Sequence, residues 1–248
     1  MRVGRRQWIR LGAAALLIVV IVGVAAFLAL PSEPVESRYG YSVSLSTTAT
    51  LQDVSLRFPI PATETNGAVV EAVSAGRAEA PAGWNVTIVD TDYGPMLQIT
   101  ADTIRAERQP DGRTYSTYGL SLAVHTDTEI DTKDPFDAEP LLRPRIDQRE
   151  RPCPNQAVPD SDETCYSFGS RAFANYTAPA GADVDVYVVA GGTNDLTGPG
   201  RPFNRYYDRV TVFLDGPQSG WSEAEGFSST GVGTYSRFGP LVGLPVAF

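Results

Sequence analysis

The chain has 248 residues, a formal net charge of −9 and a single lysine, Lys133. This length supplies enough apolar surface for one large domain or two small ones. The acidic balance excludes nucleic acid as an expected partner, because the phosphate backbone is bound through basic patches. An acidic, lysine-poor surface is typical of proteins from saline, halophilic settings, and a GC-rich genome also favours arginine over lysine, so both explanations stay open.

The first predicted element is a membrane-spanning helix over residues 11–30. These residues read LGAAALLIVVIVGVAAFLAL and carry no charge. At about 1.5 Å per residue they span roughly 30 Å, the thickness of a bilayer's hydrocarbon core. Four arginines precede the apolar run, whereas Glu33 and Glu36 follow it. The positive-inside rule therefore places residues 1–10 in the cytoplasm and everything after a linker, residues 31–38, outside the membrane.

A cleaved signal peptide has the same charge order as this N-terminus. Its apolar stretch is usually only about 7–15 residues long, which is shorter than the run at 11–30. We therefore expect a retained single-pass anchor, with cleavage as the alternative.

The chain after residue 38 reads as a series of β-strands. Residues 41–48, YSVSLSTT, alternate apolar and small polar residues with the period of a half-buried strand. A short helix is a candidate within residues 66–80, although β-branched residues disfavour it. Similar strand-like stretches recur at 54–61, 84–91, 96–104, 118–126, 172–178, 184–192 and 209–216. Many short strands with turns between them predict an all-β fold, an antiparallel β-sandwich (Ig-like or jelly-roll-like) over residues 39–248.

One segment, residues 127–165, interrupts the strand pattern. It holds eleven acidic residues, five basic residues and six prolines, and almost no alternating apolar side chains. A connection of this length within a compact domain is unusual. We expect a long excursion from a single sandwich, too polar to fold by burial. The alternative is a linker between two small domains at about 40–126 and 170–248.

Both cysteines of the chain, Cys153 and Cys165, lie in this excursion. Outside a cell, two cysteines in one loop usually pair. The sequence therefore predicts a disulfide that tethers the excursion.

A catalytic interpretation competes with the disulfide. Residues 161–165 read SDETC and resemble the T-L-x-T-C stretch of sortases at two positions. Sortases are membrane-anchored transpeptidases on a β-barrel, and the resemblance implies His125, Cys165 and Arg171 as catalytic residues. Ser161 and Asp162 depart from the family's pattern, which puts the fit of this stretch into a barrel in doubt.

Acidic side chains in the excursion are candidate calcium ligands. Residues 127–139 begin with acids at alternate positions, as in an EF-hand loop, but Thr132 and Ala138 replace the glycine and the bidentate glutamate. An irregular calcium site is one interpretation and a solvated acidic loop is the other. The candidate ligands are Asp127, Glu129, Asp131, Asp160, Asp162 and Glu163.

Other chemistries have weaker support in the sequence. One histidine and two cysteines are too few for a structural zinc site without an acidic ligand, and we expect no cofactor. Paired carboxylates for a hydrolase depend on distances in space, so a carboxylate-dependent hydrolase stays an alternative.

Two features point to the surface of the β domain. The triplets at Asn85 and Asn175 are N-x-[ST] candidate glycosylation sites. A second candidate is a sugar-stacking surface, although aromatic residues are more often part of a core. Its members would be Trp84, Trp221, Tyr206 and Tyr207.

These patterns together predict a single-pass cell-membrane protein with a cytoplasmic N-terminus and an extracytoplasmic β domain. We expect a binding or structural role at the cell envelope, with an envelope protein or a glycan as partner and the membrane contacted through residues 11–30. The alternative is a cell-surface enzyme, either the sortase-like cysteine transpeptidase or the carboxylate-dependent hydrolase. The redox state of Cys165 discriminates between them, since a sulfur held in a disulfide is no resting nucleophile.

Overall fold

A computed structural model of the chain describes residues 36–63, 67–154, 162–195, 203–233 and 235. The predicted anchor, residues 11–30, and the candidate ligand Asp160 lie outside these ranges. Within them, no helix is both long enough and apolar enough to cross a membrane.

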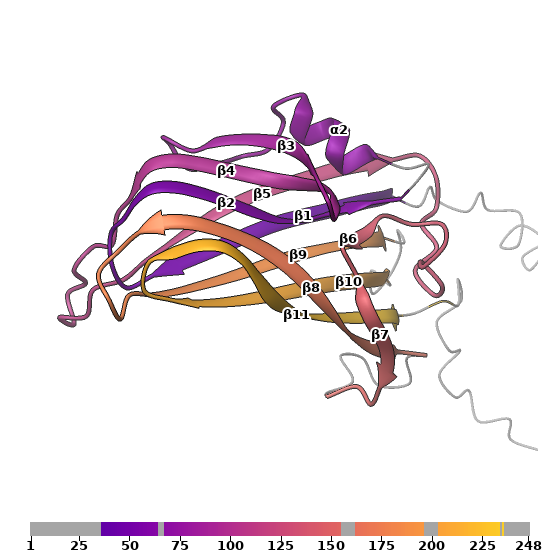
Figure 1. Ribbon diagram of the computed structural model, residues 1–248. Coiled ribbons are helices and arrows are strands. Elements are labelled where there is room, and N and C mark those ends of the chain that lie inside the picture. Colours follow the sequence, from indigo (N-terminus) through magenta and orange to yellow (C-terminus); the bar gives the residue numbers. More distant parts are fainter. Residues whose placement is uncertain (1–35, 64–66, 155–161, 196–202, 234, 236–248) are drawn as a thin grey trace, which may run out of the picture. The chain divides into compact units, whose positions relative to one another are not determined.

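The described chain is almost entirely antiparallel β-structure, which confirms the predicted all-β class. The strands are β1 (Glu36–Thr47), β2 (Leu51–Ala62), β3 (Asn85–Thr91), β4 (Gly94–Ile104), β5 (Ser116–Thr126), β6 (Leu141–Arg143), β7 (Ile146–Arg151), β8 (Thr164–Thr177), β9 (Asp183–Asp195), β10 (Phe203–Asp215) and β11 (Gln218–Gly233). They form one continuous curled sheet, where the sequence led us to expect the two separate sheets of a sandwich (Figure 1). Long twisted strands let one sheet curl far enough to supply both walls of the core.

The strand order explains how distant parts of the chain meet. It runs β3-β4-β2-β8-β11-β10-β9-β1-β5. β1 pairs with β5 on one side and with β9 on the other, so strands that precede and follow the excursion share one sheet. The two layers of the curled sheet face each other across the interior (Figure 1). There the Tyr41 hydroxyl of β1 donates a hydrogen bond of 2.8 Å to the Pro59 carbonyl of β2.

Alternation divides each long strand into an inner and an outer row. In β9, Val184, Val186 and Val188 are fully buried, whereas Asp183 and Tyr187 are exposed. Burying apolar surface stabilises the fold by about 25 cal/mol per Å², so the inner row supplies the main driving force and leaves the outer row free for other tasks.

The candidate helix within residues 66–80 is present as α2, Ala68–Ser74. It buries Val69, Ala72 and Val73 and contacts β2 and both edge strands, β3 and β5. Just beyond it, Glu79 forms a backbone bridge with Ser121 of β5. The helix and this bridge therefore cover the gap between the two edges of the sheet, which would otherwise expose unpaired backbone groups.

The excursion packs against the sheet, which corrects the expectation that it is too polar to fold by burial. Ile130, Leu141 and Leu142 are at most 3% exposed. β6 pairs with β2, and β7 pairs with β8. The few apolar residues of this segment are thus buried together, and the neighbouring polar groups find partners inside the protein.

A buried ion pair joins the excursion to the inner row of the sheet. Nη1 of Arg145 lies 2.7 Å from Oδ2 of Asp208, and the two side chains are only 4% and 1% exposed. The same carboxylate accepts hydrogen bonds from the Leu142 N–H at 2.9 Å and from the Ser228 hydroxyl. The guanidinium carbon also lies 3.9 Å from the ring centroid of Phe168. Burial lowers the pKa of Arg145, and the charge of Asp208 opposes that shift.

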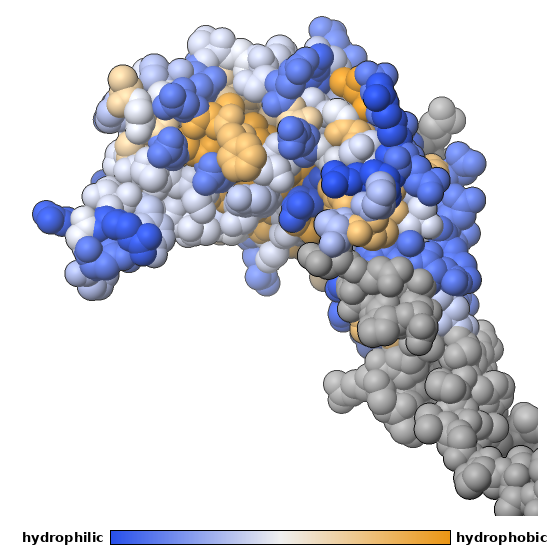
Figure 2. Space-filling view, turned by 90° about the horizontal axis from the view of Figure 1, so that it is seen from below, coloured by the Kyte–Doolittle hydropathy of each residue, from blue (hydrophilic) through white to orange (hydrophobic). Residues whose placement is uncertain are grey.

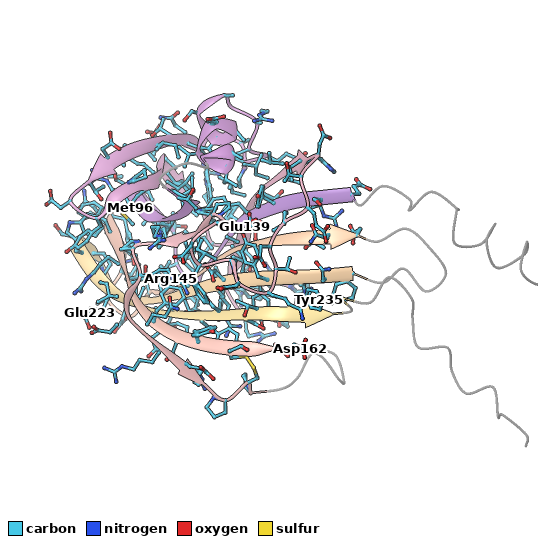
Figure 3. The ribbon with its side chains drawn as sticks, turned by 90° about the vertical axis from the view of Figure 1, so that its right-hand side faces the viewer. Met96, Glu139, Arg145, Asp162, Glu223 and Tyr235 are labelled. Atoms are coloured by element: carbon cyan, nitrogen blue, oxygen red, sulfur yellow. A yellow bond between two sulfur atoms is a disulfide. The ribbon has the colours of Figure 1, made fainter. Side chains whose placement is uncertain are left out.

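A second polar cluster holds residues 130–139 at the end of the barrel-like sheet. The Asn194 side chain accepts hydrogen bonds from the Ser37 hydroxyl at 2.7 Å and the Ile130 N–H at 3.0 Å, and it donates to the Ile130 carbonyl at 2.8 Å. The carboxylate of Glu139, labelled in Figure 3, accepts a hydrogen bond of 2.6 Å from the Tyr39 hydroxyl. These bonds compensate for removing polar groups from water.

Candidate functional site

The two cysteines lie at disulfide distance, in agreement with the sequence prediction. Their sulfur atoms are 2.06 Å apart and their Cα atoms 5.2 Å apart, and Figure 3 shows the bond. Cys165 is 1% exposed and pairs with Arg151 at the end of β7. The disulfide therefore ties the chain that follows β7 to the start of β8.

The structure does not bring the sortase-like residues together. The sulfur of Cys165 is bonded to Cys153, and four strands, β11, β10, β9 and β1, separate its strand from β5, which carries His125. The imidazole is 62% exposed, with Nδ1 3.3 Å from a carboxylate oxygen of Glu36. Arg171 pairs with Glu223 at 3.0 Å. The short resemblance to sortases therefore has no catalytic arrangement behind it in the described chain.

Among the residues that the structure describes, the candidate calcium ligands do not form a group of three acids with ligand atoms close enough to hold one ion. Oδ1 of Asp131 accepts backbone N–H groups from Lys133 at 3.1 Å and Asp134 at 3.0 Å. Nζ of Lys133 lies 2.9 Å from a carboxylate oxygen of Asp162, and this hydrogen bond holds the pKa of Asp162 below its ordinary value. Asp127 and Glu129 are exposed.

Glu163 contributes to the one metal-like cluster found in the described ranges. Its carboxylate lies with the sulfur atoms of Cys153 and Cys165 within 4.8 Å of one another. Because the two sulfurs form a disulfide, they offer no thiolate to a metal. The Glu163 carboxylate instead accepts a hydrogen bond of 2.6 Å from the Ser229 hydroxyl.

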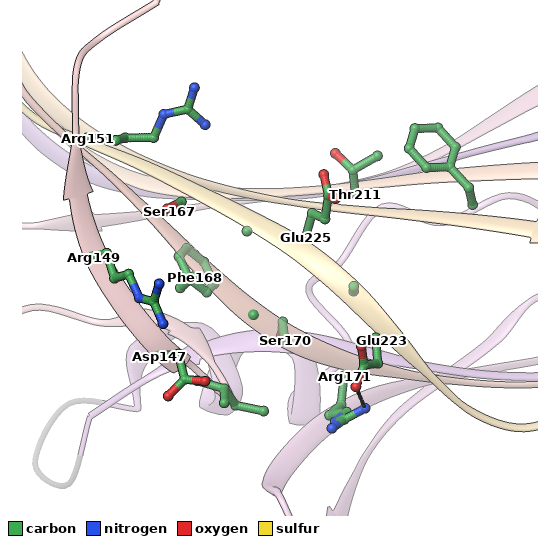
Figure 4. A pocket seen from close by; sticks show the side chains of 15 residues that line it. Asp147, Arg149, Arg151, Ser167, Phe168, Ser170, Arg171, Thr211, Glu223 and Glu225 are labelled. Carbon is green, nitrogen blue, oxygen red and sulfur yellow. Dashed lines mark hydrogen bonds and ion pairs between the residues drawn. The ribbon is translucent and has the colours of Figure 1, made fainter.

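An open groove of about 810 Å³ lies on the outer face of β7, β8, β10 and β11 (Figure 4). Figure 2 shows that the underside of the β domain carries an apolar area framed by hydrophilic residues. The charged side chains that line the groove are three arginines and three acids: Arg149, Arg151, Arg171, Asp147, Glu223 and Glu225. The groove therefore carries equal numbers of basic and acidic side chains in a protein that is acidic overall.

The backbone of β7 explains why its arginines reach the groove. β7 pairs with β8 at Ile146 and again at Arg149, with a register shift between the two. Asp147 lies in this irregular stretch with φ of 51°, and such bulges bend a strand and redirect its side chains. Beyond the bulge, Arg149 and Arg151 are two positions apart, so they project on the same side of the strand.

The groove is electrostatically divided. Arg171 is neutralised by Glu223 at 3.0 Å. The opposite end is basic: among the described residues, no carboxylate oxygen lies within 4.0 Å of Arg149, Arg151 or Arg209. We call these three arginines and the ring of Phe227 the basic end; Arg149 and Arg151 line the groove, whereas Arg209 and Phe227 adjoin it.

Pairing of four strands assembles the basic end. Arg149 of β7 lies opposite Ser167 of β8, Ser167 opposite Phe227 of β11, and Phe227 opposite Arg209 of β10. The guanidinium carbons of Arg151 and Arg209 lie 6.0 and 5.9 Å from the ring centroid of Phe227. Two cations are therefore held beside one aromatic ring, within the range of a cation–π interaction.

A second aromatic ring adjoins the basic end. The ring of Tyr207 lies 5.9 Å from that of Phe227, and the guanidinium carbon of Arg205 lies 5.8 Å from the Tyr207 ring. Burial raises the pKa of Tyr207, so its phenol stays protonated and able to donate a hydrogen bond near neutral pH.

The predicted aromatic surface is divided by the fold. Tyr206 is 1% exposed and belongs to the core, and Trp84 packs against Tyr118 with ring centroids 6.0 Å apart. Trp221 is 39% exposed and meets the ring of Tyr93 at 4.9 Å. The four residues therefore do not form one sugar-stacking surface.

Both candidate glycosylation sites lie on the surface in one row of the sheet. Asn85 and Asn175 are exposed. The row runs from Asn85 through Thr100 and Ser55 to Asn175, across β3, β4, β2 and β8. Three spacings of about 4.8 Å separate the outer strands of this row.

Comparisons with protein-family models, with curated proteins and with solved structures found no match to this chain. Its function is therefore inferred from the geometry alone.

The sequence reasoning missed the residues of the basic end. Arg149 and Arg151 were counted only as part of a net-acidic excursion, although their spacing in IDQRER is that of one strand face. Arg209 and Phe227 join them through strand register, for which the local sequence carries no signal.

Proposed function

We propose that this protein is an extracytoplasmic binding protein of the cell envelope, anchored in the membrane through residues 11–30, with residues 1–10 in the cytoplasm. The observation that carries the proposal is the basic end of the groove. In a chain with a net charge of −9, three clustered guanidinium groups without a carboxylate partner repel one another. A bound anion relieves this repulsion, and arginine binds carboxylate, sulfate and phosphate groups through paired hydrogen bonds.

Two further features support an extracytoplasmic location. A disulfide between Cys153 and Cys165 is stable in oxidising compartments outside the cytoplasm. The apolar run at 11–30 follows a group of arginines and precedes acids, which is the charge order of an anchor with its N-terminus inside.

Binding is better supported than catalysis. Cys165 is held in the disulfide, so it supplies no thiolate for a transpeptidase. Of the groove acids, Glu223 is engaged by Arg171. No described feature favours a hydrolase over a binding site, and we propose no second function.

Co-sedimentation of the full chain with purified envelope material tests the proposal. Arg149→Gln/Arg151→Gln removes two groove cations, whereas Arg77→Gln/Arg108→Gln removes two exposed arginines elsewhere and gives the same net charge. We expect the groove pair to weaken binding about tenfold, the combined effect of two partly exposed charge contacts. The control pair should leave binding unchanged.

Equal binding by the two double variants would contradict the proposal. The location is tested separately by adding protease to intact cells, where the β domain should be digested. Protection of the domain until the cells are lysed would contradict an extracytoplasmic location.

A further inference from the structure

We infer that the ligand of the groove is an acidic polysaccharide, a chain of sugar rings whose carboxylate or sulfate groups bind at the basic end. The inference rests on the proposed binding function and adds the class of ligand. It follows from the anion-binding geometry, the aromatic rings, the acids that line the groove and the pairing of the floor strands.

The anionic groups of the ligand are bound by guanidinium groups on both sides of Phe227. Arg151 approaches the ring from β7 and Arg209 from β10, each with its guanidinium carbon within 6.0 Å of the ring centroid. A planar carboxylate or sulfate can accept two parallel hydrogen bonds from one guanidinium. The guanidinium groups of Arg151 and Arg209 are therefore close enough to bind neighbouring anionic substituents of one extended chain.

The aromatic rings beside the arginines suit the faces of sugar rings. Phe227 and Tyr207 are partly exposed, in strands β11 and β10, and their rings are tilted by 44°. A pyranose presents an apolar face of C–H groups, which packs on an aromatic face. Ser167, which lies opposite Phe227, and Thr211 line the adjoining groove, and their hydroxyls can donate to or accept from sugar hydroxyls.

The carboxylates that line the groove together with the arginines disfavour other anionic surfaces. Asp147 and Glu225 line it, and a membrane with a continuous negative surface would meet these carboxylates at close range and be repelled. Carboxylates are good acceptors for neutral hydroxyl groups. A polysaccharide that alternates charged substituents with neutral hydroxyls can therefore bind both the arginines and the acids of the groove.

The floor of the groove disfavours a bound peptide strand. β8 is paired with β7 and β11 in this region, and β11 is paired with β8 and β10. Because both edges of β8 and β11 are already used, these two strands offer no backbone groups for the strand addition through which many extended peptides bind; of the lining strands, only β7 has an edge that no described strand covers. Recognition on the floor of the groove occurs through side chains, and the set present here consists of guanidinium, carboxylate, hydroxyl and aromatic groups.

Titration of the full chain with defined polymers tests the inference. The probes are polygalacturonate, dextran sulfate, neutral dextran, poly-glutamate and vesicles that contain phosphatidylglycerol. We expect polygalacturonate or dextran sulfate to bind, with the tighter of the two identifying the carboxylate or the sulfate as the anionic group. Neutral dextran, poly-glutamate and the vesicles should bind at least about tenfold more weakly.

Variants locate the binding on the groove. Arg151→Gln/Arg209→Gln should raise the Kd for the acidic polysaccharide about tenfold, and the control Arg77→Gln/Arg108→Gln should leave it unchanged. Arg151→Lys/Arg209→Lys keeps the charge but loses the planar fork, so it should bind with intermediate affinity. Phe227→Leu should weaken binding of the acidic polysaccharide more than it weakens binding of inorganic sulfate. Only the polymer has a sugar ring that can stack on the aromatic side chain. Circular dichroism of each variant confirms that it is folded.

The possible failures are distinguishable. If poly-glutamate or the vesicles bind as tightly as the polysaccharides, or if no polymer binds, the polysaccharide inference is overturned. If the groove pair Arg149→Gln/Arg151→Gln also leaves envelope binding unchanged, the proposed function fails with it.

Discussion

Asp208→Asn should destabilise the protein more than almost any other change of a single polar atom. The carboxylate of Asp208 is completely buried. It accepts hydrogen bonds from Arg145, from the Leu142 N–H and from the Ser228 hydroxyl. An asparagine keeps one acceptor oxygen and turns an NH₂ group toward one of these donors. The Arg145 side chain, 4% exposed, would then be a buried cation without a counterion.

The expected loss in the free energy of unfolding is about 3–5 kcal/mol, the cost of removing one partner of a buried ion pair. Such a loss is a large part of the roughly 5–15 kcal/mol by which a typical domain is stable. Urea titration of the full chain, followed by circular dichroism, measures it through the shift in midpoint. Asp215→Asn changes an exposed aspartate at the end of the same strand and should stay within about 0.5 kcal/mol of wild type.

A double variant separates the cost of an unpaired buried charge from the cost of altered packing. Arg145→Met/Asp208→Leu replaces both charges by apolar groups and should recover much of the stability, because no unpaired charge remains. A loss below about 1 kcal/mol for Asp208→Asn would refute the reasoning, since it would mean that water reaches Arg145. A double variant as unstable as the single one would refute it as well.

Three further outcomes are expected. Cys153→Ser opens the disulfide loop between cysteines separated by twelve positions and should lower the free energy of unfolding by about 3 kcal/mol; reduction of the wild type should give the same loss, and an unchanged urea midpoint would argue against it. Stability should fall as pH rises from 10 toward 12, because burial raises the pKa of Tyr176 to about 12 and also raises those of Tyr41 and Tyr206. The unfolded chain then loses phenolic protons that the folded chain keeps; melting temperatures that do not fall above pH 10 would contradict this. Mass spectrometry of the protein from its native source should find glycans on both Asn85 and Asn175, since both are exposed, and Asn85→Gln should remove one glycan and leave the other; unmodified peptides at both positions would refute the expectation.

The strands that sequence reasoning found are those whose inner rows are apolar. β9 is an example, because Val184, Val186 and Val188 must be buried and therefore alternate visibly with polar residues. The sheet order was not predictable in this way. β1 pairs with β9 at a distance along the chain that no local pattern encodes.

β11 was missed because its inner row is made of small residues. A Cβ atom at Gly226 would come within 2.3 Å of the Phe168 ring, so the bulk of β8 requires glycine at that position. Ser228 is small and polar because it hydrogen-bonds to Asp208 and Arg145. A stretch of glycine and serine therefore looks like a turn in sequence, although its partners make it a strand of the core.

The sequence showed only part of the groove, because its residues come from strands that lie far apart along the chain. Arg149 and Arg151 could have been assigned to one face of a short strand, because they are two residues apart. Their functional partners, Arg209 and Phe227, are supplied by strands far along the chain. The sequence indicated a glycan or protein partner, but the proposed position of its binding site depends on register.

The position of β1 between β5 and β9 has a consequence for the order of assembly. β1 is synthesised before the rest of the sheet, yet its partners β5 and β9 end at Thr126 and Asp195. At the usual rates of translation β9 is completed on the order of ten seconds after β1. Throughout that interval, Tyr41, Val43 and Leu45, which are at most 2% exposed in the finished fold, lack the complete sheet in which they are finally buried. A chaperone that recognises short apolar stretches would therefore find its binding site at the very start of the β domain, and the domain would release it only when β9 arrives.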